Sequence, residues 1–275
     1  MIAGKVHRAV HTSRRVAQTP LVFSNWAEVL SDMARGQFGR GPETLSFTTR
    51  KGLRIDCPNA PGARVPLYEV FAEDTYRLKW FLGPLIKRPI QVVDIGAHVG
   101  TFACSLSQVH LGATIQSFEP SPTTASFLRR NVAQNGLGER ITVQQRALAA
   151  ETGFAIYDDY GEGSGHNSLA GTGRTMSNSN ATKVETVAFD EVVASLPAPI
   201  AFVKMDCEGG EYDLTFGSSP DSWASVQRLV LEYHHVEGQS WEGLRTWYEN
   251  VGLQVVRHEP LTDTLGTAWL SRGPV

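Results

Sequence analysis

From about residue 89 onward, short apolar runs alternate with longer stretches in which apolar residues recur at helical spacing. The short runs are rich in β-branched residues and are bounded by turn-forming residues, a pattern that predicts buried strands. The predicted strands are residues 90–96, 114–120, 140–148, 200–206, 226–235, 253–259 and 266–272. The predicted helices are residues 99–110, 121–137 and 241–252. Because strands and helices alternate, we expect an α/β fold with a mostly parallel sheet that helices cover on both faces.

The first 88 residues follow a different pattern, with fewer strand signals and no alternation of strands with helices. The predicted elements here are a helix at 25–36, a β-hairpin at 45–57 and a helix at 66–84. We therefore divide the chain into an N-terminal helical and hairpin extension, residues 1–88, and a catalytic part that binds a cofactor, residues 89–275. The extension is expected to form a lid and to contact the substrate.

Composition narrows the classes of partner. The 275 residues are 41% hydrophobic and 19% charged, enough for one large domain with an appendage. A net charge of -3 gives no bias toward nucleic acid, and no apolar run approaches the ~20 residues of a membrane span. Three widely spaced cysteines and a basic N-terminus without an apolar core predict a reduced, cytoplasmic protein. We expect a small-molecule partner, with neither nucleic acid nor membrane, and the pattern leaves the oligomeric state open, a homo-oligomer included.

The first strand of the catalytic part ends in an acid and a glycine turn, "VVDIGAHVG", which contains Asp94, Gly96 and Gly100. A phosphate-binding loop requires a lysine after its last glycine, and none follows Gly100. A dinucleotide fingerprint requires bare backbone where this turn has His98. An NAD-dependent oxidoreductase and a non-catalytic nucleoside-binding protein therefore stay as the less favoured alternatives.

A nucleoside that carries an amino acid and no phosphate suits the turn better. Backbone N–H groups at a helix N-terminus bind a carboxylate, and Asp94 can attract an ammonium group. The second strand ends at Glu119, where a carboxylate can accept hydrogen bonds from both ribose hydroxyls. These groups together describe S-adenosylmethionine. His98 in the turn and Ala147 in the third predicted strand complete the expected cofactor-binding set.

A second group of polar residues follows two later strands. Asp206 ends the strand at 200–206, with Glu208 and Glu211 just beyond it. The next strand runs into Glu232, His234 and His235, and period-two alternation places Glu232 and His234 on one side. An acid at the end of an apolar strand costs desolvation unless it has a role, so we assign function to Asp206 and Glu232. Glu208 and Glu211 fit a helix N-terminus equally well.

Four segments, in this order, resemble the FkbM family of class I S-adenosylmethionine-dependent methyltransferases. They are "VVDIGAHVGTF", "FEPSPTTASFLRRNV", "VKMDCEGGEYD" and "LVLEYHH", and the resemblance covers about residues 67–258. It implies a Rossmann-like seven-stranded sheet whose final antiparallel strand is 266–272. It also implies that Asp94, Gly96 and Gly100 face the methionine part, Glu119 the ribose and Asp206 the reactive end.

The resemblance further implies methylation of hydroxyls on polyketides, sugars and other natural products. We expect His234 or His235 to act as the base, helped by Asp206 or Glu232. The glycine- and serine-rich segment 158–180 is expected to close over the acceptor. The substrate or lid residues are Tyr76, His166, Asn167 and Ser168. A variant with Mg²⁺ on Asp206 and Glu232 is possible but not favoured, and N- and C-methylation stay open.

Overall fold

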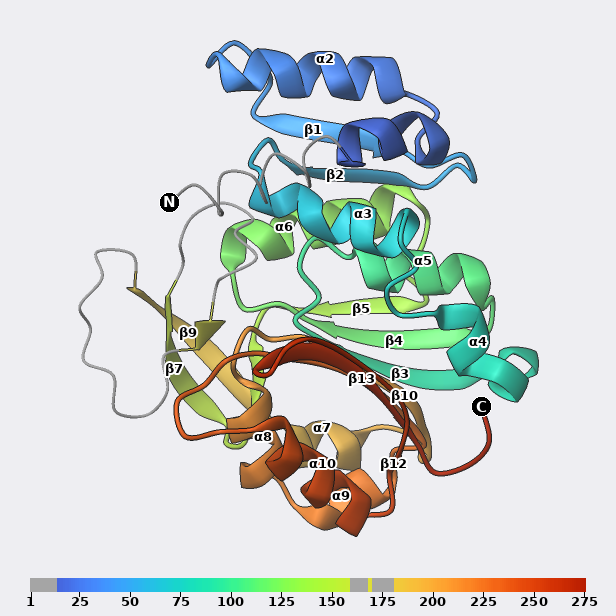
Figure 1. Ribbon diagram of the computed structural model, residues 1–275, viewed down its shortest axis with the longest axis vertical. Helices are drawn as coiled ribbons and strands as arrows, with labels where there is room; N and C mark the ends of the chain where they lie inside the picture. Colours follow the sequence, from blue (N-terminus) through green and yellow to red (C-terminus); the bar gives the residue numbers. More distant parts are fainter. Residues whose placement is uncertain (1–13, 159–167, 170–180) are drawn as a thin grey trace.

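The computed structural model describes residues 14–158, 168–169 and 181–275, and its centre is a seven-stranded sheet (Figure 1). The strand order is β12-β13-β11-β10-β3-β4-β5. Its strands are β3 (Ile90–Ile95), β4 (Ala113–Phe118), β5 (Ile141–Gln144), β10 (Ile200–Met205), β11 (Arg228–Tyr233), β12 (Gln254–Thr262) and β13 (Leu265–Ser271). β13 runs antiparallel to both of its neighbours, whereas β11, β10, β3, β4 and β5 pair in parallel. The predicted seven-stranded sheet with a reversed strand is confirmed.

Helices cover both faces of this sheet (Figure 1). One face carries α5 (Thr101–Val109) and α6 (Pro122–Gln134), and the other carries α7 (Phe189–Ser195), α8 (Glu211–Gly217), α9 (Pro220–Ala224) and α10 (Trp241–Asn250). Successive strand residues alternate between the two faces, so that Val92 belongs to one apolar core and Val93 to the other. Since both faces of the central strands β3, β10 and β11 are buried, these strands are nearly continuous apolar runs, which is why the sequence pattern revealed them.

The extension forms a further layer outside α6 (Figure 1). The predicted helix is α2 (Trp26–Gln37), and the predicted hairpin consists of β1 (Thr44–Thr48) and β2 (Arg54–Pro58). The predicted single helix at 66–84 is wrong. In its place are α3 (Val65–Phe71), α4 (Leu78–Leu82) and the short 3₁₀ helices η1 (Gly62–Arg64) and η2 (Gly83–Lys87).

The break between α3 and α4 falls at two residues whose backbone leaves the helical region. Asp74 and Arg77 both have positive φ, at 50° and 49°, which no helix interior accommodates. The resulting bend turns Tyr76 inward, where the side chain is 7% exposed and packs edge-on against Phe102 of α5. A residue of the extension therefore reaches the strand ends of the main sheet.

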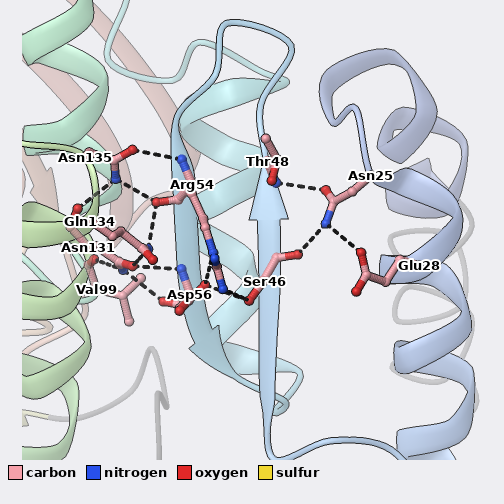
Figure 2. A network of polar contacts seen from close by, with 10 residues as sticks. All are labelled: Asn25, Glu28, Ser46, Thr48, Arg54, Asp56, Val99, Asn131, Gln134 and Asn135. Carbon is pink, nitrogen blue, oxygen red and sulfur yellow. Dashed lines mark hydrogen bonds and ion pairs between the residues drawn. The ribbon is translucent and has the colours of Figure 1, made fainter.

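The hairpin is held at its β2 edge by three amide side chains, those of Asn131 and Gln134 in α6 and of Asn135 just after it, and Gln134 donates to the Arg54 carbonyl at 2.9 Å (Figure 2). Asn131, which is fully buried, accepts a hydrogen bond from the Asp56 N–H at 2.8 Å and donates to the Asp56 carbonyl at 2.9 Å. Asn135 makes the same pair of contacts with the backbone of Arg54, at 2.9 and 2.7 Å. Because these contacts satisfy the edge of β2, the hairpin docks without pairing to another strand.

The β1 edge is likewise hydrogen-bonded by an asparagine side chain, here from the start of α2. Asn25, at the start of α2, accepts from the Thr48 N–H at 2.8 Å and donates to the Ser46 carbonyl at 2.8 Å (Figure 2). Asn131 also donates to the carbonyl of Val99 at 2.8 Å, in the turn before α5. One side chain of α6 thus joins the hairpin to that turn.

A second sheet lies beside the ends of the main strands (Figure 1). Its strands, in the order β6-β9-β7-β8, are β6 (Ala147–Ala149), β7 (Gly153–Asp158), β8 (Ser168–Leu169) and β9 (Ala181–Ala188). The single strand predicted at 140–148 is wrong, because the chain leaves the main sheet after β5 and enters this second sheet as β6. Over the described ranges, no helix has the length and apolarity that crossing a bilayer requires.

Candidate active site

A cleft opens at the carboxyl ends of β3, β4 and β10, where the strand order reverses between β3 and β10. It holds about 700 Å³ of space between atoms, part of which is open to solvent. The predicted residues at its wall are Gly96, His98, Glu119, Ala147 and Asp206. Ile95, Phe118 and Leu148 add apolar surface, and Pro66 of α3 closes one side. An apolar slot with a few polar groups suits a nucleoside.

The turn after β3 requires both of its glycines. Gly96 has φ +72°, and a Cβ there would lie 1.8 Å from the carbonyl oxygen of Asp206. Gly100 has φ +88°, and its Cβ would lie 2.4 Å from Leu128 Cδ1 on α6. The backbone of the turn therefore packs directly against the segment after β10, which is possible only without a side chain.

Glu119 follows β4 and is 5% exposed. Its carboxylate accepts hydrogen bonds from the N–H groups of His98 and Ser121, each at 2.9 Å. Burial raises the pKa of Glu119 to about 7, although both hydrogen bonds favour the charged form. Since a carboxylate has about four lone-pair sites, two stay available toward the cleft.

Asp94 does not lie at the wall of the cleft, where a contact with an ammonium group was expected. The side chain is fully buried behind the turn, and its Oδ2 accepts from the Ser117 hydroxyl at 3.3 Å. Its Oδ1 lies 3.6 Å from the ammonium nitrogen of Lys204. Asp94 therefore does not touch the cleft and can act on it only indirectly, through Lys204 and Ser117.

Asp206 lies at the boundary between the cofactor cleft and the rest of the site. Its Oδ2 accepts from the Tyr76 hydroxyl at 3.2 Å and lies 3.7 Å from Lys204 Nζ. A quarter of the side chain is exposed. Tyr76 from the extension and Asp206 from the sheet therefore form one polar contact between the two parts of the chain.

His234 lies among carboxylates on the same side. Its Nδ1 is 3.0 Å from Glu211 Oε1, and its Nε2 is 3.5 Å from Glu208 Oε2 and 3.9 Å from Glu232 Oε1. His235, the next residue, is exposed to solvent. The predicted pairing of Glu232 with His234 on one side is confirmed, and Tyr233 on the other side bonds His258 at 2.9 Å.

Glu211 is a buried anchor as well as the first residue of α8. It is fully buried and accepts from the N–H groups of Cys207 and Gly209, at 3.0 and 2.9 Å, besides contacting His234. The carboxylate therefore fixes both the turn after β10 and the orientation of the imidazole. An ionised Glu211 accepts a proton-bearing Nδ1, which leaves Nε2 as the nitrogen that faces the other acids.

The electrostatics of the group favour bound protons. Burial alone lowers the pKa of His234, but the hydrogen bond and charge of Glu211, together with the charge of Asp206, outweigh it and raise the pKa to about 10. Burial raises the pKa of Glu208 to about 8 and that of Glu232 well above its usual value. Glu69 of α3 faces the same acids, and burial raises its pKa to about 7.

Three side chains of this group lie close enough together to hold a metal ion. One ligand atom each from Asp206, Glu232 and His234 lies within 4.8 Å of the others. Two carboxylates and an imidazole can hold a divalent cation. The set contains both residues that the sequence proposed for a metal.

Three further predicted residues lie in the segment after β7. His166 and Asn167 fall outside the described residues, as does most of the predicted loop at 158–180. Ser168 begins β8, which pairs with β7.

The sequence did not single out Lys204 or Glu69, and it read Glu211 as equally well a helix-start acid. A lysine inside the apolar run "IAFVKMD" is the signal that could have identified Lys204, because a buried charge requires partners. Nothing local marked Glu69, which becomes half-buried where α3 packs at the cleft.

The comparisons with known proteins agree with this geometry. The model of the methyltransferase FkbM domain matches residues 94–255. The 31-O-demethyl-FK506 methyltransferase FkbM of Streptomyces tacrolimicus is 28% identical over 225 residues, which span 71% of this chain and 83% of that protein. Methyltransferase 1 of Beauveria bassiana is 22% identical over 186 residues, spanning 62% of this chain and 74% of that protein.

Among solved structures, the methyltransferase FkbM from Methylobacillus flagellatus is similar with a TM-score of 0.47 and 17% identity. The similarity covers 66% of this chain and 43% of that one. The family match itself extends from Asp94 in the first strand to Val255 in β12, more than half of the sequence. The chain therefore belongs to the FkbM family of S-adenosylmethionine-dependent methyltransferases.

Proposed function

We propose that this methyltransferase transfers the methyl group of S-adenosylmethionine to a hydroxyl group of a small natural product. The observation that carries the proposal is the layout of the site. Glu119, Asp206 and Glu208 line one largely apolar cleft, and Asp206 and Glu208 also belong to the polar group around His234. The relative named for 31-O-demethyl-FK506 supports an oxygen acceptor.

The cleft residues supply binding and alignment. Glu119 would accept hydrogen bonds from the ribose hydroxyls, and Ile95, Phe118 and Leu148 would pack against the base. The turn at Gly96 would hold the amino-acid end, and Asp206 would lie nearest the reacting atoms. When bound, the cofactor supplies a methyl group already activated by its sulfonium charge. Since the donor is activated, the protein mainly has to orient the acceptor and remove its proton.

His234 is the better candidate for the base. It is largely buried and oriented by Glu211, whereas His235 is exposed and has no such partner. In the protein alone, His234 holds its proton at neutral pH because of the acids around it. The negative charge of those acids is partly offset when a cationic cofactor is bound, so the pKa of His234 falls toward the working range. His234 can then take the proton of the acceptor hydroxyl.

A metal-assisted variant is the second candidate, because Asp206, Glu232 and His234 can converge on one cation. The carboxylates suit Mg²⁺, whereas an imidazole ligand is more usual for transition metals. In this variant His234 would be a ligand and could not serve as the base. Full activity after exhaustive dialysis against EDTA would exclude it.

Calorimetry with S-adenosylhomocysteine and with NAD⁺, each with and without Mg²⁺, tests the proposal. We expect S-adenosylhomocysteine to bind and NAD⁺ not to bind, because His98 stands where a dinucleotide needs bare backbone. Binding of NAD⁺ alone would contradict the assignment of the cleft. A screen of hydroxylated natural products with labelled methyl donor would then identify the acceptor, and methylation of nitrogen or carbon alone would contradict the choice of oxygen.

A further inference from the structure

Lys204 is a buried cation in the middle of the main sheet. It occupies β10, whose six residues are all buried, and it is itself 3% exposed. In register it lies beside Asp94 of β3 and Val230 of β11. A charge at such a place is unfavourable unless several groups compensate it, so its partners indicate what it does.

The ammonium group of Lys204 contacts both the glycine turn after β3 and the acid after β10. It donates to the carbonyl oxygens of Gly96 at 2.6 Å and Ile95 at 3.2 Å, which belong to the glycine turn. The same nitrogen lies 3.6 Å from Asp94 Oδ1 and 3.7 Å from Asp206 Oδ2. One side chain therefore ties the turn after β3 to the acid after β10.

These contacts act on groups that line the cleft, although Lys204 does not line it. Gly96 and Asp206 are at the wall, and the close approach of their backbones leaves no room for a Cβ between them. With the carbonyls of the turn held toward Lys204, the path of the backbone at the cleft is fixed. Asp206 is likewise held between Lys204 and the Tyr76 hydroxyl.

We propose that Lys204 is a positioning residue that shapes the part of the cleft for the amino-acid end of the cofactor. The proposal rests on the function proposed above. Lys204 makes no hydrogen bond or ion pair with Glu119, and its contact with the apolar wall is confined to the main-chain carbonyl of Ile95 in the glycine turn, so we expect the nucleoside end to depend on it less. Loss of the ammonium group is therefore expected to weaken the binding of the amino-acid end selectively.

Two ligands separate the ends of the cleft. S-adenosylhomocysteine carries both the nucleoside and the amino acid, and 5′-methylthioadenosine carries the nucleoside alone. For Lys204→Met, which keeps most of the side-chain volume, we expect S-adenosylhomocysteine to bind about tenfold or more weakly. The affinity for 5′-methylthioadenosine is expected to change less than about twofold. Both are measured by calorimetry up to millimolar ligand, with Lys87→Met, at an exposed lysine, as the matched control.

Lys204→Met leaves Asp94 buried without its cation, which can prevent folding. The double variant Asp94→Asn with Lys204→Met removes both charges and is expected to fold with the same selective loss. Equal weakening of both ligands, or no weakening of either, would overturn the proposal and leave Lys204 a structural ion-pair partner. If the unaltered protein bound neither ligand, the proposed function itself would fail, and that outcome is distinct from the other two.

Discussion

Glu119 shows how backbone groups prepare a single side chain for binding. Two N–H donors hold its carboxylate at the cleft wall. In Glu119→Gln one donor would face an amide NH₂, and the ribose would lose an anionic acceptor. We expect affinity for S-adenosylhomocysteine to fall about tenfold, which is about 1.4 kcal/mol. Calorimetry checks this, with Glu139→Gln at an exposed position as control; unchanged affinity would show that Glu119 does not contact the cofactor.

The two adjacent histidines form a natural matched pair. His234 is oriented by Glu211 among the acids, and His235 is exposed. We expect His234→Gln to lower kcat on the identified acceptor roughly 100-fold or more, with affinity for S-adenosylhomocysteine nearly unchanged. His235→Gln is expected to leave both within about twofold. Steady-state kinetics with calorimetry tests the pair, and equal losses in the two variants would contradict the assignment of His234.

For single residues, the sequence was most informative where the position along a strand decides which side chains lie together. Gly96, Glu119 and Asp206 are at strand ends, and the sheet brings strand ends together, so their meeting was predictable. The depth of each side chain was not. Asp94 and Glu119 both follow apolar runs, yet one is sealed behind the turn and the other lines the cleft. That difference arises from how the turn packs on the segment after β10.

At the scale of elements, the docking of the hairpin on α6 involves two asparagines that differ in burial, with Gln134 sharing the Arg54 carbonyl. Asn131 is fully buried with three backbone contacts, and Asn135 is partly exposed and lies just beyond the end of α6. Asn131→Leu leaves the Asp56 N–H and two carbonyls without a partner, so we expect the free energy of unfolding to fall by about 2–4 kcal/mol. Asn135→Leu is expected to cost about 1 kcal/mol.

Urea denaturation followed by fluorescence measures both variants. Equal effects would indicate that burial of the amide does not control docking. Because Asn131 also holds the Val99 carbonyl, its loss is further expected to weaken cofactor binding. A stability loss without any change in binding would confine the role of Asn131 to the hairpin.

Two element boundaries were mispredicted for physical reasons. The pattern at 66–84 is amphipathic throughout, but Asp74 and Arg77 adopt positive φ because the bend lets Tyr76 reach Asp206. The run at 140–148 is apolar throughout, but it serves two sheets. Tertiary contacts override local pattern in both cases. β7 and β9 were not predicted, since their pairing spans a long intervening segment.

For the whole molecule, the buried acids set how stability depends on pH. Burial raises the pKa values of Glu69 and Glu119 to about 7 in the folded chain, against 4.5 as the ordinary value. Each contributes stability that is fully present below pH 4.5 and is lost as the pH rises through 7, because the folded state then has to bury a charge. We expect Tm without ligand to fall by roughly 5 °C between pH 5 and pH 7.5.

Scanning calorimetry across this range tests the dependence. The double variant Glu69→Gln with Glu119→Gln is expected to show a flatter profile, because neither amide titrates. A Tm that rose with pH over this window would contradict the raised pKa values.

The general fold could be predicted from the sequence, because it depends on the alternation of strands and helices, which composition and periodicity were sufficient to predict.

The asparagine contacts on both edges of the hairpin also bear on how acceptor range could be altered by recombination. Exchange of residues 1–88 alone is expected to disturb this packing, because the backbone of β2 is hydrogen-bonded by Asn131 of α6 and by Asn135 just after it. A crossover at residue 88 would place the β2 strand of one protein against the α6 helix of another, whose side chains need not match it. A crossover after residue 135 would transfer the hairpin together with α6, which holds it, and with the glycine turn, which lies between them in the sequence.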